Sequence, residues 1–120
     1  MSTGIEGFHG SFAEWLGRLP TPEGESYVVA QEQGSLKLGL FAPRGVDLQQ
    51  PHTQDEIYVV IRGEGQFING STRHAFGPGD LLYVPAEVEH RFEGFSDDLA
   101  VWVVFYGPEG GERVDAEAGS

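Results

Sequence analysis

Short apolar runs alternate with turn-forming residues along most of the chain, at a spacing of roughly eight to twelve residues. This pattern is typical of an all-β sandwich or barrel, because each run is long enough for one strand and too short for a helix. The predicted strands are residues 27–30, 36–41, 56–62, 66–68, 72–76, 81–84, 90–95 and 99–106. Asn69 and Gly70 lie between two of these runs and favour a tight hairpin turn.

One short helix is expected ahead of the strands, over residues 12–19. Ser11 and Glu14 have the spacing of a capping box, and the apolar residues that follow share one helical face. Pro20 ends the helix. We expect this helix to cover one end of the sheet, as part of an N-terminal segment spanning residues 1–25.

Composition limits the classes of partner. The 120 residues fit one domain with a core, which we expect over residues 26–107. Nineteen acids against seven bases give a net charge of −12, which argues against nucleic acid or an anionic membrane as partner. Residues 108–120 contribute to this excess and have almost no apolar content, so we expect a disordered acidic tail there.

Several absences complete this picture. The chain has no cysteine, which excludes disulfides and thiolate metal sites. It has no apolar run long enough to span a membrane, and its first residues lack the features of a signal peptide. The expected location is therefore cytoplasmic.

The predicted strand 56–62 begins with an acid where burial is expected. A buried carboxylate costs several kcal/mol unless it is paired or bound to a metal. In an extended chain Gln50, His52, Glu56 and Tyr58 would face the same side, and His90 begins a later strand. Two imidazoles and one carboxylate on a concave face would form a metal site with open positions. The alternative is that His52 and Glu56 form a hydrogen-bonded structural pair.

Two sequence motifs favour the metal site, because both resemble motifs of the cupin superfamily. The first cupin motif ends in His, three or four residues, Glu, six residues and Gly, which His52, Glu56 and Gly63 match. The second contains Gly, five residues, Pro, and a later His, which Gly79, Pro85 and His90 match. The resemblance implies a double-stranded β-helix, or jelly roll, that closes into a barrel.

The resemblance also implies a ligand set for a divalent transition metal, namely Gln50, His52, Glu56 and His90. Gln50 stands where the family has its first His. Glu87 and Gly94 replace the Gly and Asn of the second motif. An amide oxygen is a weaker ligand than imidazole for zinc or copper, so a site with Gln50 is expected to bind these metals more weakly than a site with His at that position. Iron, manganese, zinc and nickel all remain open.

The same alternation predicts the walls of a pocket beside this site. Tyr58 and Phe92 would point inward, where Phe92 is expected to be part of the core, and the leucines of strand 36–41 would form another apolar wall. Lys37 and Arg91 have outward parity, so no cation is expected on the inner face. A small, partly apolar organic ligand would suit such a pocket.

Two classes of function follow from these features. One is a metal-dependent enzyme, for which the cupin resemblance implies dioxygenase, isomerase or lyase chemistry, with Tyr58 as the candidate proton donor. The other is a non-catalytic module that binds a sugar or another small ligand at a degenerate metal site. The residues alone do not choose between them.

A homodimer is also expected. The strands 56–62 and 99–106 are apolar on both faces, although one face of an isolated sheet should meet water. Ile57, Val59 and Ile61 would point outward and form a large apolar patch. A partner sheet or the helix 12–19 must then cover them.

Overall fold

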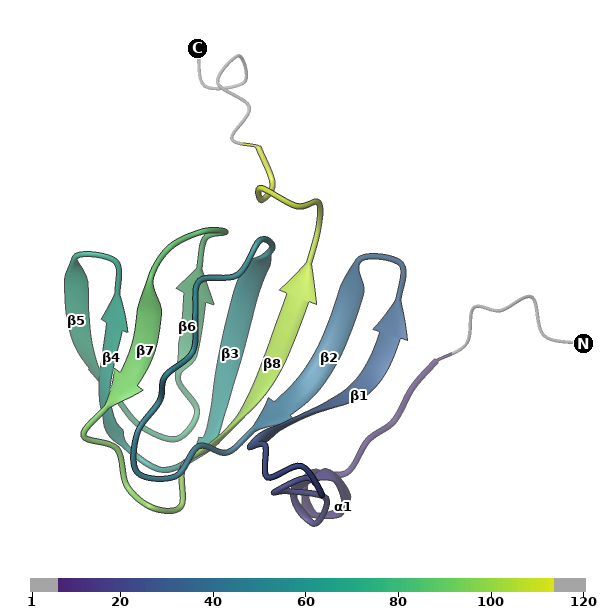
Figure 1. Ribbon diagram of the computed structural model, residues 1–120, viewed down its shortest axis with the longest axis vertical. Helices are drawn as coiled ribbons and strands as arrows, with labels where there is room; N and C mark the ends of the chain where they lie inside the picture. The colour runs from purple at the N-terminus through teal and green to yellow at the C-terminus, as the bar shows by residue number, and fades with distance from the viewer. Residues whose placement is uncertain (1–6, 114–120) are drawn as a thin grey trace, which may run out of the picture.

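Eight strands and one short helix make up the part of the chain that the structure, a computed structural model, describes, which is residues 7–113 (Figure 1). The elements are α1 (Phe12–Leu16), β1 (Tyr27–Gln33), β2 (Leu36–Phe41), β3 (Asp55–Arg62), β4 (Gly65–Asn69), β5 (Thr72–Phe76), β6 (Leu81–Val84), β7 (His90–Glu93) and β8 (Ala100–Tyr106).

The strands form two antiparallel sheets. The larger has the order β1-β2-β8-β3-β6 and the smaller has the order β5-β4-β7. Over residues 7–113 the strand pairings do not join the edges of the two sheets, so the jelly roll is not closed into a complete barrel. The prediction of an all-β jelly roll preceded by a short helix is confirmed, and each predicted strand is present.

The core lies between the two sheets. Tyr58 from β3, Val103 from β8 and Phe92 from β7 belong to one buried cluster, together with Phe67 from β4. The rings of Phe67 and Phe92 are 4.8 Å apart, and those of Tyr58 and Phe92 are 5.1 Å apart. The edge-on contact between Tyr58 and Phe92 ties the larger sheet to the smaller one, and the tilted contact between Phe67 and Phe92 joins β4 to β7 within the smaller sheet.

The helix is shorter than the expected range 12–19, because it ends at Leu16. Its beginning is as predicted, since the Ser11 side chain accepts a hydrogen bond from the Glu14 amide at 3.1 Å. Gly17 then caps the other end. Strand β7 is likewise shorter than the range 90–95, because Gly94 adopts a φ of 55° that turns the chain out of the sheet.

The described part of the N-terminal segment, residues 7–25, covers part of the outer face of the larger sheet. The rings of Phe12 and Trp102 meet edge-on at 6.4 Å, and Phe8 lies with Leu38 and Trp102 around an apolar groove. Leu40 on β2 is completely buried. The expectation that the leucines of β2 form the inner wall is wrong, because Leu38 faces the groove beside Phe8, whereas Lys37 and Phe41, which have the opposite parity, line the inner cavity.

The last described residues are held against the start of β3. Asp55 accepts hydrogen bonds from the backbone amides of Ala86 at 2.9 Å and Glu112 at 2.8 Å. A tail was expected over residues 108–120; its first part, up to residue 113, contacts Asp55, and residues 114–120 lie outside the described range. Within residues 7–113, the single helix is far too short to cross a membrane.

Candidate metal centre and pocket

Three potential metal ligands meet at the inner side of the larger sheet. Glu56 is the second residue of β3, His90 is the first residue of β7, and His52 lies in the connection between β2 and β3. One ligand atom from each lies within 4.8 Å of the others. His90 Nε2 is 3.1 Å from Glu56 Oε1, and His52 Nε2 is 3.9 Å from the same oxygen. The convergence of these three predicted residues is therefore a feature of the fold.

Strand geometry explains two of these positions. Glu56, Tyr58 and Val60 alternate along β3 and are all about 1% exposed, so they share the buried face. His90 and Phe92 do the same on β7, at 3% and 1% exposure. Glu56 is thus buried by the same alternation that builds the core.

The position of His52 depends on the connection between β2 and β3, which is not a strand. Residues 42–54 run past β7 before they enter β3 (Figure 1), and extended alternation does not hold along them. Gln50 was expected beside His52 on the inner face, but it is exposed and does not line the pocket. Its neighbour Gln49 reaches the cluster instead. Its Oε1 lies 3.2 Å from His52 Nε2 and 3.1 Å from His90 Nε2.

Asp47 holds Gln49 in this orientation, and neither residue was identified from the sequence. The buried Asp47 carboxylate accepts hydrogen bonds from the Gln49 side-chain amide at 2.7 Å and from the Phe92 backbone amide at 2.9 Å. A carboxylate is only an acceptor, so the Gln49 NH₂ group faces Asp47 and Oε1 faces the imidazoles. The two-residue spacing of Asp47 and Gln49 was the available signal, but it is common in ordinary turns.

The hydrogen bonds around the cluster leave acceptors facing one another. His90 Nδ1 lies 2.9 Å from the Val88 carbonyl oxygen, which can only accept, so Nδ1 carries the proton and neutral His90 presents a lone pair on Nε2. Gln49 presents a carbonyl oxygen, and Glu56 presents a carboxylate oxygen. Glu56 Oε1 is buried and has no hydrogen-bond partner among residues 7–113, because its 3.1 Å approach to His90 lacks hydrogen-bond geometry. Such a set is satisfied by a cation or by a proton on His90.

The pKa directions agree with this picture. Burial opposes the protonation of His90, but the Glu56 carboxylate and the Val88 carbonyl outweigh it and raise the pKa of His90. Burial lowers the pKa of His52, and the charge of Glu56 only partly offsets this. Burial, reinforced by Glu56, raises the pKa of Tyr58 well above its usual value. The cluster therefore attracts positive charge, and His52 offers a neutral imidazole.

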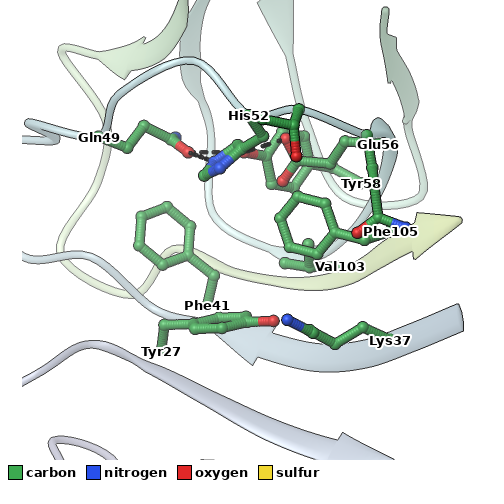
Figure 2. A pocket seen from close by; sticks show the side chains of 11 residues that line it. Tyr27, Lys37, Phe41, Gln49, His52, Glu56, Tyr58, Val103 and Phe105 are labelled. Atoms are coloured by element: carbon green, nitrogen blue, oxygen red, sulfur yellow. Dashed lines mark hydrogen bonds and ion pairs between the residues drawn. The ribbon is translucent and has the colours of Figure 1, made fainter. Parts of the chain in front are cut away.

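A cavity of about 360 Å³ opens beside the cluster (Figure 2). Phe41, Val103 and Phe105 form apolar walls, and His52, Glu56 and Tyr58 form one polar end. The Tyr58 hydroxyl donates a hydrogen bond to Gln49 Oε1 at 3.0 Å. Phe92 points inward as expected, and it belongs to the core cluster rather than to the lining of the cavity.

Lys37 also lines this cavity, which corrects the expectation of an inner face without cations. Lys37 and Phe41 have the same parity on β2, and both contribute to the cavity. Arg91, on β7, is exposed as expected and pairs with Glu93 at 2.6 Å.

Comparison with known proteins agrees with the fold and shows the family. Residues 38–106 match the family model described as a cupin domain. The chain is 37% identical over 86 residues to an uncharacterized protein of Streptomyces coelicolor, covering 70% of this chain and 82% of that protein. The protein therefore belongs to the cupin family.

Other relatives are more distant. A mannose-6-phosphate isomerase of Arabidopsis thaliana is 36% identical over 61 residues, which is 50% of this chain but only 14% of the isomerase. A solved structure from Rhizobium leguminosarum, of unknown function, superposes with a TM-score of 0.68 at 18% identity and covers 87% of this chain and all of that one. A cupin-2 domain from Rhodospirillum rubrum gives a TM-score of 0.56 at 20% identity, over 79% of this chain and 70% of that chain. At these identities the solved structures support the fold alone.

Proposed function

We propose that this cupin binds one divalent transition metal ion through His52, Glu56 and His90, with the amide oxygen of Gln49 as a fourth ligand. The observation that carries the proposal is the convergence of acceptor atoms around the buried Oε1 of Glu56, which has no hydrogen-bond partner in the described part of the chain. Imidazole nitrogens and one carboxylate are the donor set of iron, manganese, zinc and nickel sites. The Gln50 ligand predicted from the sequence is replaced by Gln49 in this proposal.

The bound metal would supply a Lewis acid with positions open to the oxygens of a small ligand. The residues around it have separate roles. His90 is oriented by the Val88 carbonyl and Gln49 by Asp47, so these two ligands need little reorganisation. The apolar walls of the cavity exclude water from one side of a bound ligand.

The proposed reaction class is that of a metal-dependent enzyme, of the dioxygenase, isomerase or lyase type, acting on a small organic substrate. Tyr58 is the proposed proton donor, since its hydroxyl lies at the cluster and keeps its proton at neutral pH. A non-catalytic ligand-binding or sugar-sensing module is the second candidate. Two properties of the Tyr58 hydroxyl favour this second candidate. The hydroxyl already donates a hydrogen bond to Gln49, and its raised pKa makes it a weak acid.

Elemental analysis of protein purified without chelators or an affinity tag tests the metal site. Wild-type protein should contain one metal ion per chain, and His52→Ala and His90→Ala should lose it. His74→Ala is the matched control, because His74 is exposed on β5 outside the site, and it should keep full occupancy. Full occupancy in both site variants would show that the metal lies elsewhere.

Ligand binding then separates the two functions. Small bidentate oxygen ligands, such as 2-oxo acids or catechols, should stabilise the metal-loaded protein and not the metal-free protein. A ligand at one hundred times its dissociation constant adds about 2.7 kcal/mol to the free energy of unfolding, which a thermal shift detects. Equal shifts for both forms would favour the binding module.

The homodimer expected from the sequence also stays a proposal. Phe12 covers Trp102, but Leu81 and Tyr83 on β6 are 70% and 49% exposed, and they lie opposite Val59 and Ile57 on β3. A second copy of the chain would cover this apolar edge. Light scattering should report twice the chain mass for wild type and the single-chain mass for Leu81→Lys; a single-chain mass for wild type would contradict the dimer.

A further inference from the structure

The end of the cavity away from the imidazoles carries two hydrogen-bond donors. Lys37 on β2 and Tyr27 on β1 both line the cavity. Figure 2 shows the Lys37 amine and the Tyr27 hydroxyl pointing toward one another, with Phe41 and Phe105 between them and the imidazole end. The cavity therefore has acceptors at one end, donors at the other, and apolar walls between.

The Tyr27 hydroxyl is a donor without a partner. Its oxygen is buried and makes no hydrogen bond with any residue in the range 7–113. Burial, followed by the charge of Glu56, raises the pKa of Tyr27 to about 12, so the hydroxyl keeps its proton at neutral pH. A buried, unpartnered hydroxyl costs free energy comparable to a lost hydrogen bond, which a ligand acceptor would recover.

Gly39 makes room for this arrangement. A Cβ atom added at Gly39 would lie 2.5 Å from Cε1 of Tyr27 and 2.8 Å from its hydroxyl oxygen. The Tyr27 ring thus lies directly over the backbone of β2, on the face that also bears Lys37 and Phe41. A larger residue at position 39 would push the hydroxyl out of the cavity.

Lys37 is the only lysine of the chain. Among the described residues, the one carboxylate within 4.0 Å of its amine is that of Glu32, at 3.7 Å. Both side chains are more than a third exposed, and such surface pairs contribute at most about 1 kcal/mol. Lys37 can therefore turn from Glu32 to an anion in the cavity at little cost.

We infer that Lys37 and Tyr27 bind a carboxylate at the far end of a small ligand whose other end reaches the His52, Glu56 and His90 cluster. The substrate class is a short-chain acid that carries metal-chelating oxygens at the opposite end. A carboxylate accepts both available donors and compensates the lysine charge. The apolar walls fit the carbon chain between the two ends, and about 360 Å³ is ample for such a molecule. The inference rests on the proposed metal site for the chelating end.

A matched pair of probes tests the carboxylate subsite. 2-Oxoglutarate and 2-oxopentanoate share the chelating end and the chain length, and differ in a carboxylate or a methyl group at the far end. Calorimetry on the metal-loaded protein should give at least about tenfold tighter binding of 2-oxoglutarate, which is about 1.4 kcal/mol. Lys37→Met and Tyr27→Phe should each reduce this preference, with 2-oxopentanoate affinity unchanged.

Arg73→Met is the control, because it removes one positive charge from an exposed position on β5. It should keep the wild-type preference, which excludes an effect of net charge alone. The inference is overturned if wild-type protein shows no preference, or if the preference survives in both Lys37→Met and Tyr27→Phe.

Metal content measured on the same samples separates this inference from the proposed function. Wild-type protein without metal would overturn the proposed function. In that case a preference of metal-free protein for 2-oxoglutarate that requires Lys37 would support the subsite alone, and no preference would overturn it as well.

The single lysine gives a second readout. Acetylation of Lys37, followed by mass spectrometry, should slow severalfold in saturating 2-oxoglutarate, while the α-amino group reacts at an unchanged rate. An unchanged rate for Lys37 under conditions where calorimetry shows bound 2-oxoglutarate would overturn the inference.

Discussion

Two buried carboxylates stand next to each other at the start of β3, and their surroundings differ. Asp55 is 2% exposed and accepts hydrogen bonds from two backbone amides, those of Ala86 and Glu112. Glu56 is 1% exposed, points to the opposite face, and has an oxygen without a hydrogen-bond partner among residues 7–113. The hydrogen-bonding capacity of Asp55 is therefore met within the protein, whereas Glu56 requires a cation or a proton on His90.

The difference shows that burial of an acid does not by itself mark a functional site. The two backbone amides satisfy the Asp55 carboxylate and hold its pKa below the usual value. The carboxylate thereby holds the segment up to residue 113 against β3. The neighbours of Glu56 are Gln49, His52 and His90. These side chains present lone pairs to the Glu56 carboxylate, or at most one proton among the three of them. Satisfied acceptors stabilise a fold, and unsatisfied ones that converge form a cation site.

Replacing Glu56 with its isosteric amide should have the largest effect. Glu56→Gln should abolish stoichiometric metal binding, because the only anionic ligand is lost. The free energy of unfolding of the metal-free protein should stay the same or rise, since removal of a poorly paired buried charge is neutral or stabilising. Elemental analysis and urea unfolding measure the two quantities.

The matched change at Asp55 should have the opposite result, a loss of stability without a loss of metal. Asp55→Asn should lower the free energy of unfolding by about 2–3 kcal/mol, because the new NH₂ group faces a backbone amide that needs an acceptor. The variant should keep one metal ion per chain. A metal loss as large as that of Glu56→Gln would show that the two acids are not separate in function.

The two glutamines before β3 sharpen the comparison further. Gln49→Ala should weaken metal binding by about tenfold, because a positioned ligand is lost, whereas Gln50→Ala should leave the affinity unchanged. A competition titration with a chelator measures both. Equal effects would return Gln50 to the ligand set predicted from the sequence.

Asp47 should give the smallest effect on the metal, since it acts through Gln49. Asp47→Asn leaves the Gln49 amide without its charged acceptor, so metal affinity should fall severalfold. Combined with Gln49→Ala it should add nothing further, which a double-mutant cycle tests. Additive losses would mean that Asp47 affects the metal by another route.

Much of the fold was predictable because alternation in a strand is a local property. Each predicted strand exists, and Glu56, Tyr58 and His90 share the inner side because strand parity places them there. Strand parity carries no information on the cellular compartment, so the cytoplasmic location stays a prediction.

The sequence by itself determined the all-β class, the two motifs, and the strand-borne site residues Glu56 and His90. Only the tertiary structure decided that Gln49 and not Gln50 meets the imidazoles. The connection from β2 to β3 has no regular period, and its course is fixed by the Asp47 carboxylate, which accepts hydrogen bonds from the Gln49 side chain and from the Phe92 amide on β7. The tertiary structure also turned Lys37 into the cavity, since the N-terminal segment covers the apolar face of β2. Alternation identifies two faces of a strand, but which one lines a pocket depends on what packs against each.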